Sequence, residues 1–241
     1  MSFSLFISDL HLAAERPRIV DAFHEFIRGP AREAEALYVL GDLFEYWAGD
    51  DDLEDPLNAS IAAAFSGLRS GGTTIYFMHG NRDPLVGLEF AQRAGATLLE
   101  DPTSVELYGT PTLLMHGDTL CTDDVEYQKF RAYVRDPQTQ KRFLALPLAA
   151  RRAELEKLRM RSESAKQAKT AEIMDVNEGA VQDALRKAGY PRLIHGHTHR
   201  PARHVHVVDG LDCERWVLGD WYEKGSYLRC DAGGCKSIAL G

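Results

Sequence analysis

The sequence contains few cysteines, no long apolar run and no excess of basic residues. Its four cysteines include no Cys-x-x-Cys pair, and only Cys230 and Cys235 lie close together. We therefore expect reduced thiols, as in a cytosolic protein, and neither a disulfide framework nor a thiolate zinc site.

Long hydrophobic stretches are also missing. No segment approaches the roughly 18 consecutive apolar residues of a membrane-spanning helix. The first residues carry no basic region ahead of an apolar stretch, so no signal peptide is expected. Any membrane contact should therefore be peripheral. The net charge of −8 argues against general binding to nucleic acid.

What is present fits one α/β domain spanning residues 1–241, of which 44% are hydrophobic and 27% charged. Short apolar or β-branched runs predict strands at residues 3–8, 36–40, 73–78, 103–107 and 112–115. Apolar residues at helical spacing predict helices at residues 17–27, 57–68 and 85–94. A later group of short strands suggests a second sheet stacked on the first, at residues 192–195, 202–208, 214–218, 226–230 and 237–240.

The alternation of strands and helices is interrupted over residues 122–188, where the pattern is helical. We interpret this block as an insertion that forms a cap over the functional site. Residues 141–169 hold nine Lys or Arg and three Asp or Glu, a net +6, against 19 and 33 in the rest of the chain, a net −14. Basic charge is therefore concentrated in the predicted cap.

Polar residues follow the predicted strands where these end. The motifs are Asp9-x-His11, Gly41-Asp42, Gly80-Asn81-Arg82-Asp83, His116 and Gly196-His197-Thr198-His199. Ligands of open α/β sheets bind at this edge. A mixture of carboxylate, imidazole and amide oxygen suits divalent ions such as Mn²⁺ or Fe²⁺. Asp42 is the natural carboxylate to bridge two such ions.

Extended backbone is expected to align these side chains. Alternate residues of a strand share one face, so Asp9 and His11 should project together. His195, His197 and His199 could do so only if a strand runs into a loop there, and the glycine before His197 allows a tight turn.

Other polar clusters are expected to have no role in the site. The carboxylates of residues 50–52 cannot converge on one ion, so we interpret them as a solvated loop and helix start. His204 and His206 are expected to be ordinary surface residues.

Taken together, the motifs from Asp9 to His199 resemble those of the calcineurin-like metallophosphoesterase family. The resemblance implies a four-layer αββα sandwich of two mixed sheets flanked by helices, with the helical cap inserted. It also implies two divalent ions, for which Mn²⁺ is expected. Carried onto the matching positions, the ligands of the first ion would be Asp9, His11, Asp42 and His199. Those of the second would be Asp42, Asn81, His116 and His197.

Two histidines are left over from this assignment. We expect His195 and His79 to orient ligands or to support the structure, because ligating histidines need outer partners that fix their orientation.

Arg82 stands where most members of the family have histidine. With the Ser-Asp-Leu-His-Leu start and the helical insertion, it resembles the branch that acts on a UDP-linked lipid in lipid A biosynthesis. The resemblance implies that activated water attacks the α-phosphorus of UDP-2,3-diacylglucosamine and releases UMP and 2,3-diacylglucosamine 1-phosphate. Asn81 and Arg82 would be catalytic, and a guanidinium can bind phosphate oxygens in a bidentate fork.

The resemblance also implies a set of substrate contacts, several of them in the cap. They are Asn81, Arg82, Asp124, Tyr127, Ser162, Lys166, Lys169 and His197. A basic and apolar cap over an acidic body suggests that a cytoplasmic protein associates peripherally with the inner membrane, where each basic residue near an anionic surface contributes about 1 kcal/mol.

Two other functions would use the same motifs. A phosphoesterase of the same fold could act on cyclic nucleotides, phosphoproteins or soluble dinucleotides, although Arg82 and the basic insertion argue against it. A non-catalytic binding scaffold would be expected to lose metal ligands, and this chain retains all of them.

Overall fold

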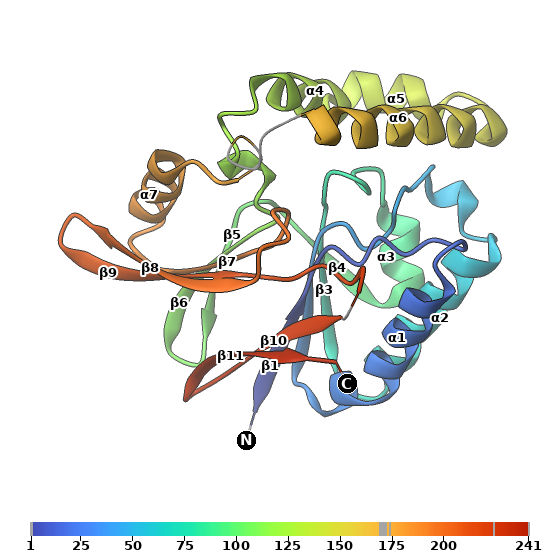
Figure 1. The fold of residues 1–241 in the computed structure, drawn as a ribbon. Coiled ribbons are helices and arrows are strands. Elements are labelled where there is room, and N and C mark those ends of the chain that lie inside the picture. The colour runs from blue at the N-terminus through green and yellow to red at the C-terminus, as the bar shows by residue number, and fades with distance from the viewer. Residues whose placement is uncertain (1, 169–172, 174, 224, 241) are drawn as a thin grey trace.

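The computed structural model describes residues 2–168, 173, 175–223 and 225–240, with side chains left undescribed between 161 and 168. Two mixed β-sheets lie face to face, with helices on their outer faces (Figure 1). The predicted class of fold is confirmed.

The first sheet has the strand order β11-β10-β1-β2-β3-β4. Its strands β1 to β4 are parallel, while β10 and β11 are antiparallel to their neighbours. Their bounds are β1 Phe3–Ile7, β2 Ala36–Leu40, β3 Thr74–Met78, β4 Ala96–Leu99, β10 Ser226–Asp231 and β11 Gly234–Ala239. Strand β4 was not predicted, because four half-exposed residues carry no clear alternation.

The second sheet has the order β5-β6-β7-β9-β8. Its bounds are β5 Thr103–Leu107, β6 Thr110–Met115, β7 Arg192–His195, β8 Ala202–Val208 and β9 Leu211–Val217. The predicted grouping of strands was partly wrong: β10 pairs with β1 and so extends the first sheet, whereas β5 and β6 belong to the second. Strand pairing is a non-local choice that the local pattern does not carry.

Alternating side chains build the layers. Leu5 and Leu37 face α1 (Pro17–Arg28), α2 (Pro56–Ser70) and α3 (Leu88–Ala94). Their neighbours Phe6 and Tyr38 stack with ring centroids 4.7 Å apart and pack towards Leu114 and Ile194 of the second sheet. The outer face of that sheet is covered by α7 (Glu178–Lys187), whose Val181 and Leu185 are fully buried.

The predicted insertion divides into two parts. Helices α4 (Val125–Arg135), α5 (Pro137–Leu144) and α6 (Leu148–Ala168) lie together above the carboxyl ends of β1, β2 and β3 (Figure 1), and we name them the cap helices. Helix α7 packs on the second sheet instead. In the described part of the chain, no helix combines the length and apolar character needed to cross a bilayer.

The carboxylates at 50–52 lie in a short 3-10 helix, as the expected helix start implied, but they anchor structure instead of forming a solvated loop. Asp50 accepts hydrogen bonds from backbone N–H groups at the start of α3. Asp51 pairs with Arg151 of α6, and Asp52 pairs with Arg152. Each carboxylate thus has its own partner, and two of them hold the first turn of α6 against the body.

Cys230 and Cys235 form a disulfide, contrary to the expectation of four reduced thiols. They face each other in the register of the β10–β11 hairpin, with Cα atoms 4.1 Å apart. This proximity arises from the turn between the strands, whereas Cys121 and Cys213 are free and buried.

Candidate metal centre

The predicted ligands converge at one edge of the two sheets. Asp9 follows β1, Asp42 follows β2 and Asn81 follows β3, while His116 and His197 follow β6 and β7 of the second sheet. The site therefore lies where the carboxyl ends of β1, β2 and β3 meet those of β6 and β7, below the cap helices (Figure 1).

The backbone at this edge is left-handed, so the expectation of extended backbone at Asp9 and His11 was wrong. Asp9, His11, Asp42, His197 and His199 have φ between 51° and 67°. A residue other than glycine in this region costs about 1–3 kcal/mol, which surrounding contacts must offset, and such residues cluster at functional sites. Tight turns at the strand ends therefore direct these side chains inward.

Two glycines allow the loops to approach closely. A Cβ atom at Gly80 would overlap Asp42, and one at Gly196 would overlap Ser8 Oγ and Asp9 Oδ2. Any larger residue at either position would push apart the loops that carry the polar side chains.

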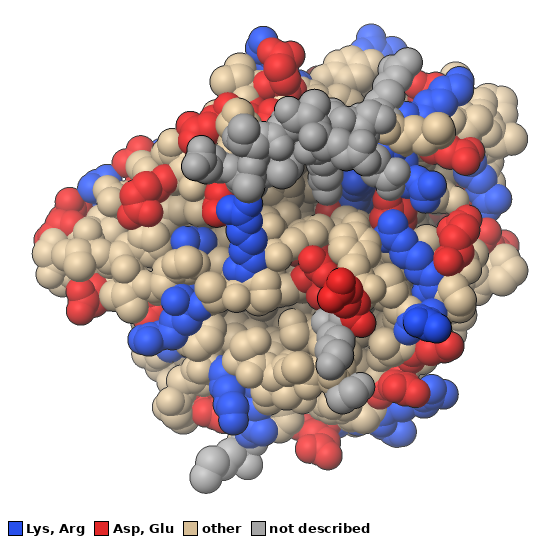
Figure 2. All heavy atoms as spheres, in the orientation of Figure 1, with Lys and Arg blue, Asp and Glu red and all other residues tan. Residues whose placement is uncertain are grey.

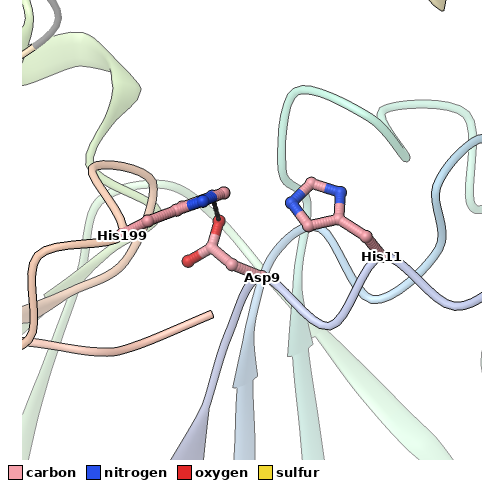
Figure 3. Close-up of side chains that lie close together, drawn as sticks. All are labelled: Asp9, His11 and His199. Atoms are coloured by element: carbon pink, nitrogen blue, oxygen red, sulfur yellow. Dashed lines mark ion pairs between the residues drawn. The ribbon is translucent and has the colours of Figure 1, made fainter. Parts of the chain in front are cut away.

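Asp9, His11 and His199 form the first group (Figure 3). Asp9 is fully buried, and its Oδ2 accepts from Ser8 Oγ at 2.6 Å and from the His197 N–H at 2.9 Å. Its other oxygen, Oδ1, lies 3.3 Å from His199 Nε2. Asp9 Oδ1 and both ring nitrogens of His11 are buried without a hydrogen bond. Unsatisfied buried acceptors of this kind fit a cation.

Asp42 and His116 form a second group with Asp9, which is shared with the first, and Asn81 and His197 lie beside His116. Asn81 Oδ1 lies 2.8 Å from His197 Nδ1 and 3.1 Å from His116 Nε2. Asp42 lies between the groups: its Oδ2 is 3.7 Å from His11 Nε2 and its Oδ1 is 3.8 Å from His116 Nε2. The position of Asp42 suits a carboxylate shared by two ions.

The electrostatics of the buried histidines reflect this density of carboxylates. Burial disfavours the charged form of His199, yet its contacts with Asp220 and Asp9 raise its pKa to about 10. Burial acts likewise on His116, but Asp42 leads the neighbouring carboxylates that raise its pKa to about 9. Burial and the charge of His116 lower the pKa of His197 to about 4. The carboxylates of the site therefore stabilise positive charge at His199 and His116, whereas His197 favours its neutral form.

Asp83 holds the loops in place, a role that sequence reasoning missed. It is fully buried and accepts from the backbone N–H groups of Gly80, Asp42, Leu43 and Phe44 at 2.8–3.3 Å. One carboxylate thus joins the loop after β2 to the loop after β3. The feature of the sequence that could have indicated this role is the position of Asp83 in the Gly-Asn-Arg-Asp motif.

Glu45 is a second residue that was missed. Although it is only 2% exposed, its Oε2 lies 2.9 Å from Arg16 Nη1 and 3.4 Å from His11 Nδ1, and its Oε1 lies 3.9 Å from Arg82 Nη1. Burial opposes its charge, but His11, Arg82 and Arg16 together lower its pKa to about 2. A charged residue within the apolar run at 43–48 was the available signal.

Arg82 lies at the edge of the second group. Its backbone N–H donates to Asp42 Oδ1 at 2.7 Å, while its mostly buried side chain extends towards Glu45. Its guanidinium therefore lies next to Glu45, whose other oxygen faces His11.

Two predicted substrate contacts lie at the start of α4. Asp124 caps the helix by accepting from the Tyr127 N–H at 3.1 Å. The Tyr127 hydroxyl donates to Asp118 Oδ2 at 2.9 Å, and its ring lies 5.6 Å from that of His197. The side chains of Ser162 and Lys166, and the whole of Lys169, lie outside the described residues.

The remaining histidines lie outside both groups. His195 is fully buried and bonds to the Gly196 carbonyl and to Arg215. His79 Nε2 lies 2.6 Å from the Val86 carbonyl. His206 was expected at the surface, but it is only 7% exposed because it lies beneath Glu178 of α7. His204, also expected there, is partly exposed.

The chain belongs to the calcineurin-like phosphoesterase family, whose model matches residues 4–201. Among curated proteins, relatives named UDP-2,3-diacylglucosamine hydrolase are similar over nearly the whole chain. The one from Aromatoleum aromaticum is 56% identical and covers 96% of this chain and 94% of its own. Those from Cellvibrio japonicus and Pseudomonas paraeruginosa are each 51% identical. The alignment with the first covers 96% of this chain and of the relative, and that with the second covers 95% of each. A solved archaeal phosphodiesterase aligns over 99% of both chains, but at 13% identity and a TM-score of 0.47 it adds nothing to this assignment.

Proposed function

We propose that this chain hydrolyses the pyrophosphate bond of UDP-2,3-diacylglucosamine and releases UMP and 2,3-diacylglucosamine 1-phosphate. The observation that carries the proposal is the identity of 56% with a relative of that name over 96% of the chain. The five clustered carboxylates and histidines, with Asn81 and His197 beside them, support it, because such a site suits the phosphoester chemistry of the family.

Two divalent ions, with Mn²⁺ preferred, are proposed as cofactors. Asp9, His11, Asp42 and His199 would hold the first ion. Asp42, Asn81, His116 and His197 would hold the second. When bound, the pair supplies positive charge that activates water and polarises a phosphoryl oxygen. The donors of this site are oxygen and nitrogen atoms, which suit Mn²⁺, whereas a closed zinc site would favour thiolates.

Asn81 and Arg82 are proposed to contact the substrate. The Arg82 guanidinium stays charged and can bind phosphate oxygens as negative charge develops on them. It offers no proton to the leaving group, but phosphate is a good leaving group that needs little acid assistance. Glu45 Oε1 lies 3.9 Å from Arg82 Nη1 and forms an ion pair with this side chain.

We also propose that the insertion at 122–188 caps the site and binds the lipid part of the substrate. Asp124, Tyr127, Ser162, Lys166, Lys169 and His197 are the proposed contacts. A cytoplasmic protein associated peripherally with the inner membrane would meet its lipid substrate there.

The direct test is to incubate the purified protein with Mn²⁺ and UDP-2,3-diacylglucosamine and to measure UMP. His116→Ala, which removes a proposed ligand, is the matched inactive control. Absence of UMP together with rapid cleavage of cyclic nucleotides or dinucleotides would instead support another phosphoesterase. Absence of all hydrolysis despite bound metal would support a binding scaffold.

The site of attack is tested in ¹⁸O-labelled water. Attack at the α-phosphorus places the label in UMP. Label in the lipid phosphate would contradict that part of the proposal.

A further inference from the structure

One buried arginine, Arg215 of β9, links two histidines that lie outside the metal centre. Its Nε donates to His206 Nε2 at 2.9 Å, and its Nη1 donates to His195 Nε2 at 3.1 Å. All three residues are less than 8% exposed. In the described part of the chain, these two rings are the hydrogen-bond partners of the guanidinium, and no carboxylate lies within ion-pairing distance of it.

This arrangement determines where each ring carries its proton. A guanidinium has no acceptor atom, so Nε2 of both rings must be unprotonated. The proton of each neutral ring is then on Nδ1. Both Nδ1 atoms face acceptors: His195 Nδ1 lies 2.8 Å from the Gly196 carbonyl, and His206 Nδ1 lies 2.9 Å from Glu178 Oε1.

Gly196 begins the loop that carries the proposed metal ligands His197 and His199. Its carbonyl faces His195 Nδ1 and also accepts a hydrogen bond of 2.8 Å from the Thr198 N–H. The Gly196 N–H donates a hydrogen bond of 2.8 Å to the His116 carbonyl. The Gly196–His197 peptide is therefore held at both ends, since its carbonyl faces His195 and Thr198 and its N–H donates to Asp9 Oδ2 at 2.9 Å. The left-handed turn at His197, with φ of 67°, starts from this fixed peptide.

We propose that Arg215 is a positioning residue: by holding His195 as its Nδ1–H tautomer, it fixes the Gly196 peptide and so presents His197 and His199 to the metal ions. The inference rests on the proposed metal centre for its consequence. The tautomer itself does not depend on that centre, so the two can fail separately.

The tautomers are tested on the full-length, metal-free protein by ¹⁵N NMR of the histidine rings. The expected spectrum shows the Nδ1–H form for both His195 and His206 in the wild type. In Arg215→Met, His195 should show an increased Nε2–H population. A wild-type His195 in the Nε2–H form would overturn the proposal.

Metal binding tests the consequence. Arg215→Met should weaken Mn²⁺ binding about tenfold, the lower end of the effect of outer partners on metal affinity. The matched control is Arg203→Met, which removes the same charge from the neighbouring strand β8, where Arg203 pairs with Glu214 instead. Equal affinities in the two variants would overturn the positioning role. Failure of the wild type to bind Mn²⁺ would overturn the proposed function and leave the tautomer result standing.

A pair of variants at His195 serves if Arg215→Met does not fold. His195→Asn places an amide donor near the position of Nδ1 and should largely retain Mn²⁺ affinity. His195→Leu removes the donor and should lose about tenfold, less than His199→Ala, which removes a ligand. Equal affinity in the Asn and Leu variants would show that His195 only fills space.

Discussion

At the scale of single residues, the buried carboxylates of the centre divide into two kinds. Asp9 and Asp42 direct oxygens towards imidazoles across the site, whereas Asp83 turns both oxygens to backbone N–H groups. The first kind is suited to metal binding and the second to holding loops. The two kinds predict different experimental outcomes.

Asp83→Asn should destabilise the fold. The amide group that replaces one carboxylate oxygen cannot accept hydrogen bonds, so buried N–H groups of the loops lose their partner at a cost of about 2–4 kcal/mol. Urea unfolding measures this loss, with Asp212→Asn on the exposed surface of β9 as the control. An unfolding free energy within 0.5 kcal/mol of the wild type, the range of ordinary surface changes, would show that these bonds contribute little.

Glu45→Gln should act mainly on metal affinity and less on the free energy of unfolding. The variant removes the charge next to His11 Nδ1 and Arg82 Nη1, and loss of such an outer partner lowers metal affinity by roughly tenfold. Mn²⁺ titration followed by electron paramagnetic resonance measures the affinity. Glu54→Gln, which breaks the exposed pair with Arg93, is the control. Unchanged Mn²⁺ affinity in Glu45→Gln would contradict the role given to Glu45.

At the scale of elements, the cap helices are attached at a few defined points. Arg135 of α4 donates to the His79 and Gly80 carbonyls, so this helix contacts the loop that carries Asn81. Arg131 pairs with the buried Asp118 at 2.7 Å. These contacts connect the position of α4 to the geometry of the metal centre.

Arg151→Met should loosen the start of α6. Arg151 is 2% exposed and donates to the Ala48 carbonyl and Asp51, so the variant loses an ordered anchor worth about 1–3 kcal/mol. Hydrogen exchange of α6 residues up to Met160 should accelerate, while exchange in α7 should not. Arg142→Met on the exposed face of α5 is the control. Unchanged exchange in α6 would show that other contacts hold this helix.

At the scale of the whole molecule, basic residues are concentrated in one segment of the chain. Basic side chains gather over the end of the cap formed by α5 and α6, with acidic ones among them (Figure 2). Residues 141–169 carry a net +6 in a chain of net charge −8. The proposed association with an anionic membrane surface would depend on this concentration of basic residues.

The full chain is therefore expected to co-sediment with vesicles of anionic phospholipid at low salt. Binding should be absent with zwitterionic vesicles and should fall in 0.5 M NaCl, because salt screens such attraction within a few ångströms. Failure to bind anionic vesicles at low salt would contradict the proposed peripheral association.

The sequence by itself determined most of the strands and helices and the residue types of the candidate site. Periodicity located strands such as Phe3–Ile7 and Ala36–Leu40, since a buried strand requires a local apolar run. The motifs identified Asp9, Asp42 and His197 as candidates, because carboxylate, imidazole and amide side chains recur together at the ends of several strands.

The tertiary structure alone decided which segments meet. The pairing of β10 with β1 and of Cys230 with Cys235, and the burial of His206 under α7, depend on contacts between distant segments or across a turn. The left-handed turns that direct Asp9 and His11 inward arise from the same cause. Local propensity favours extended backbone there, and only packing from several loops stabilises the rarer conformation.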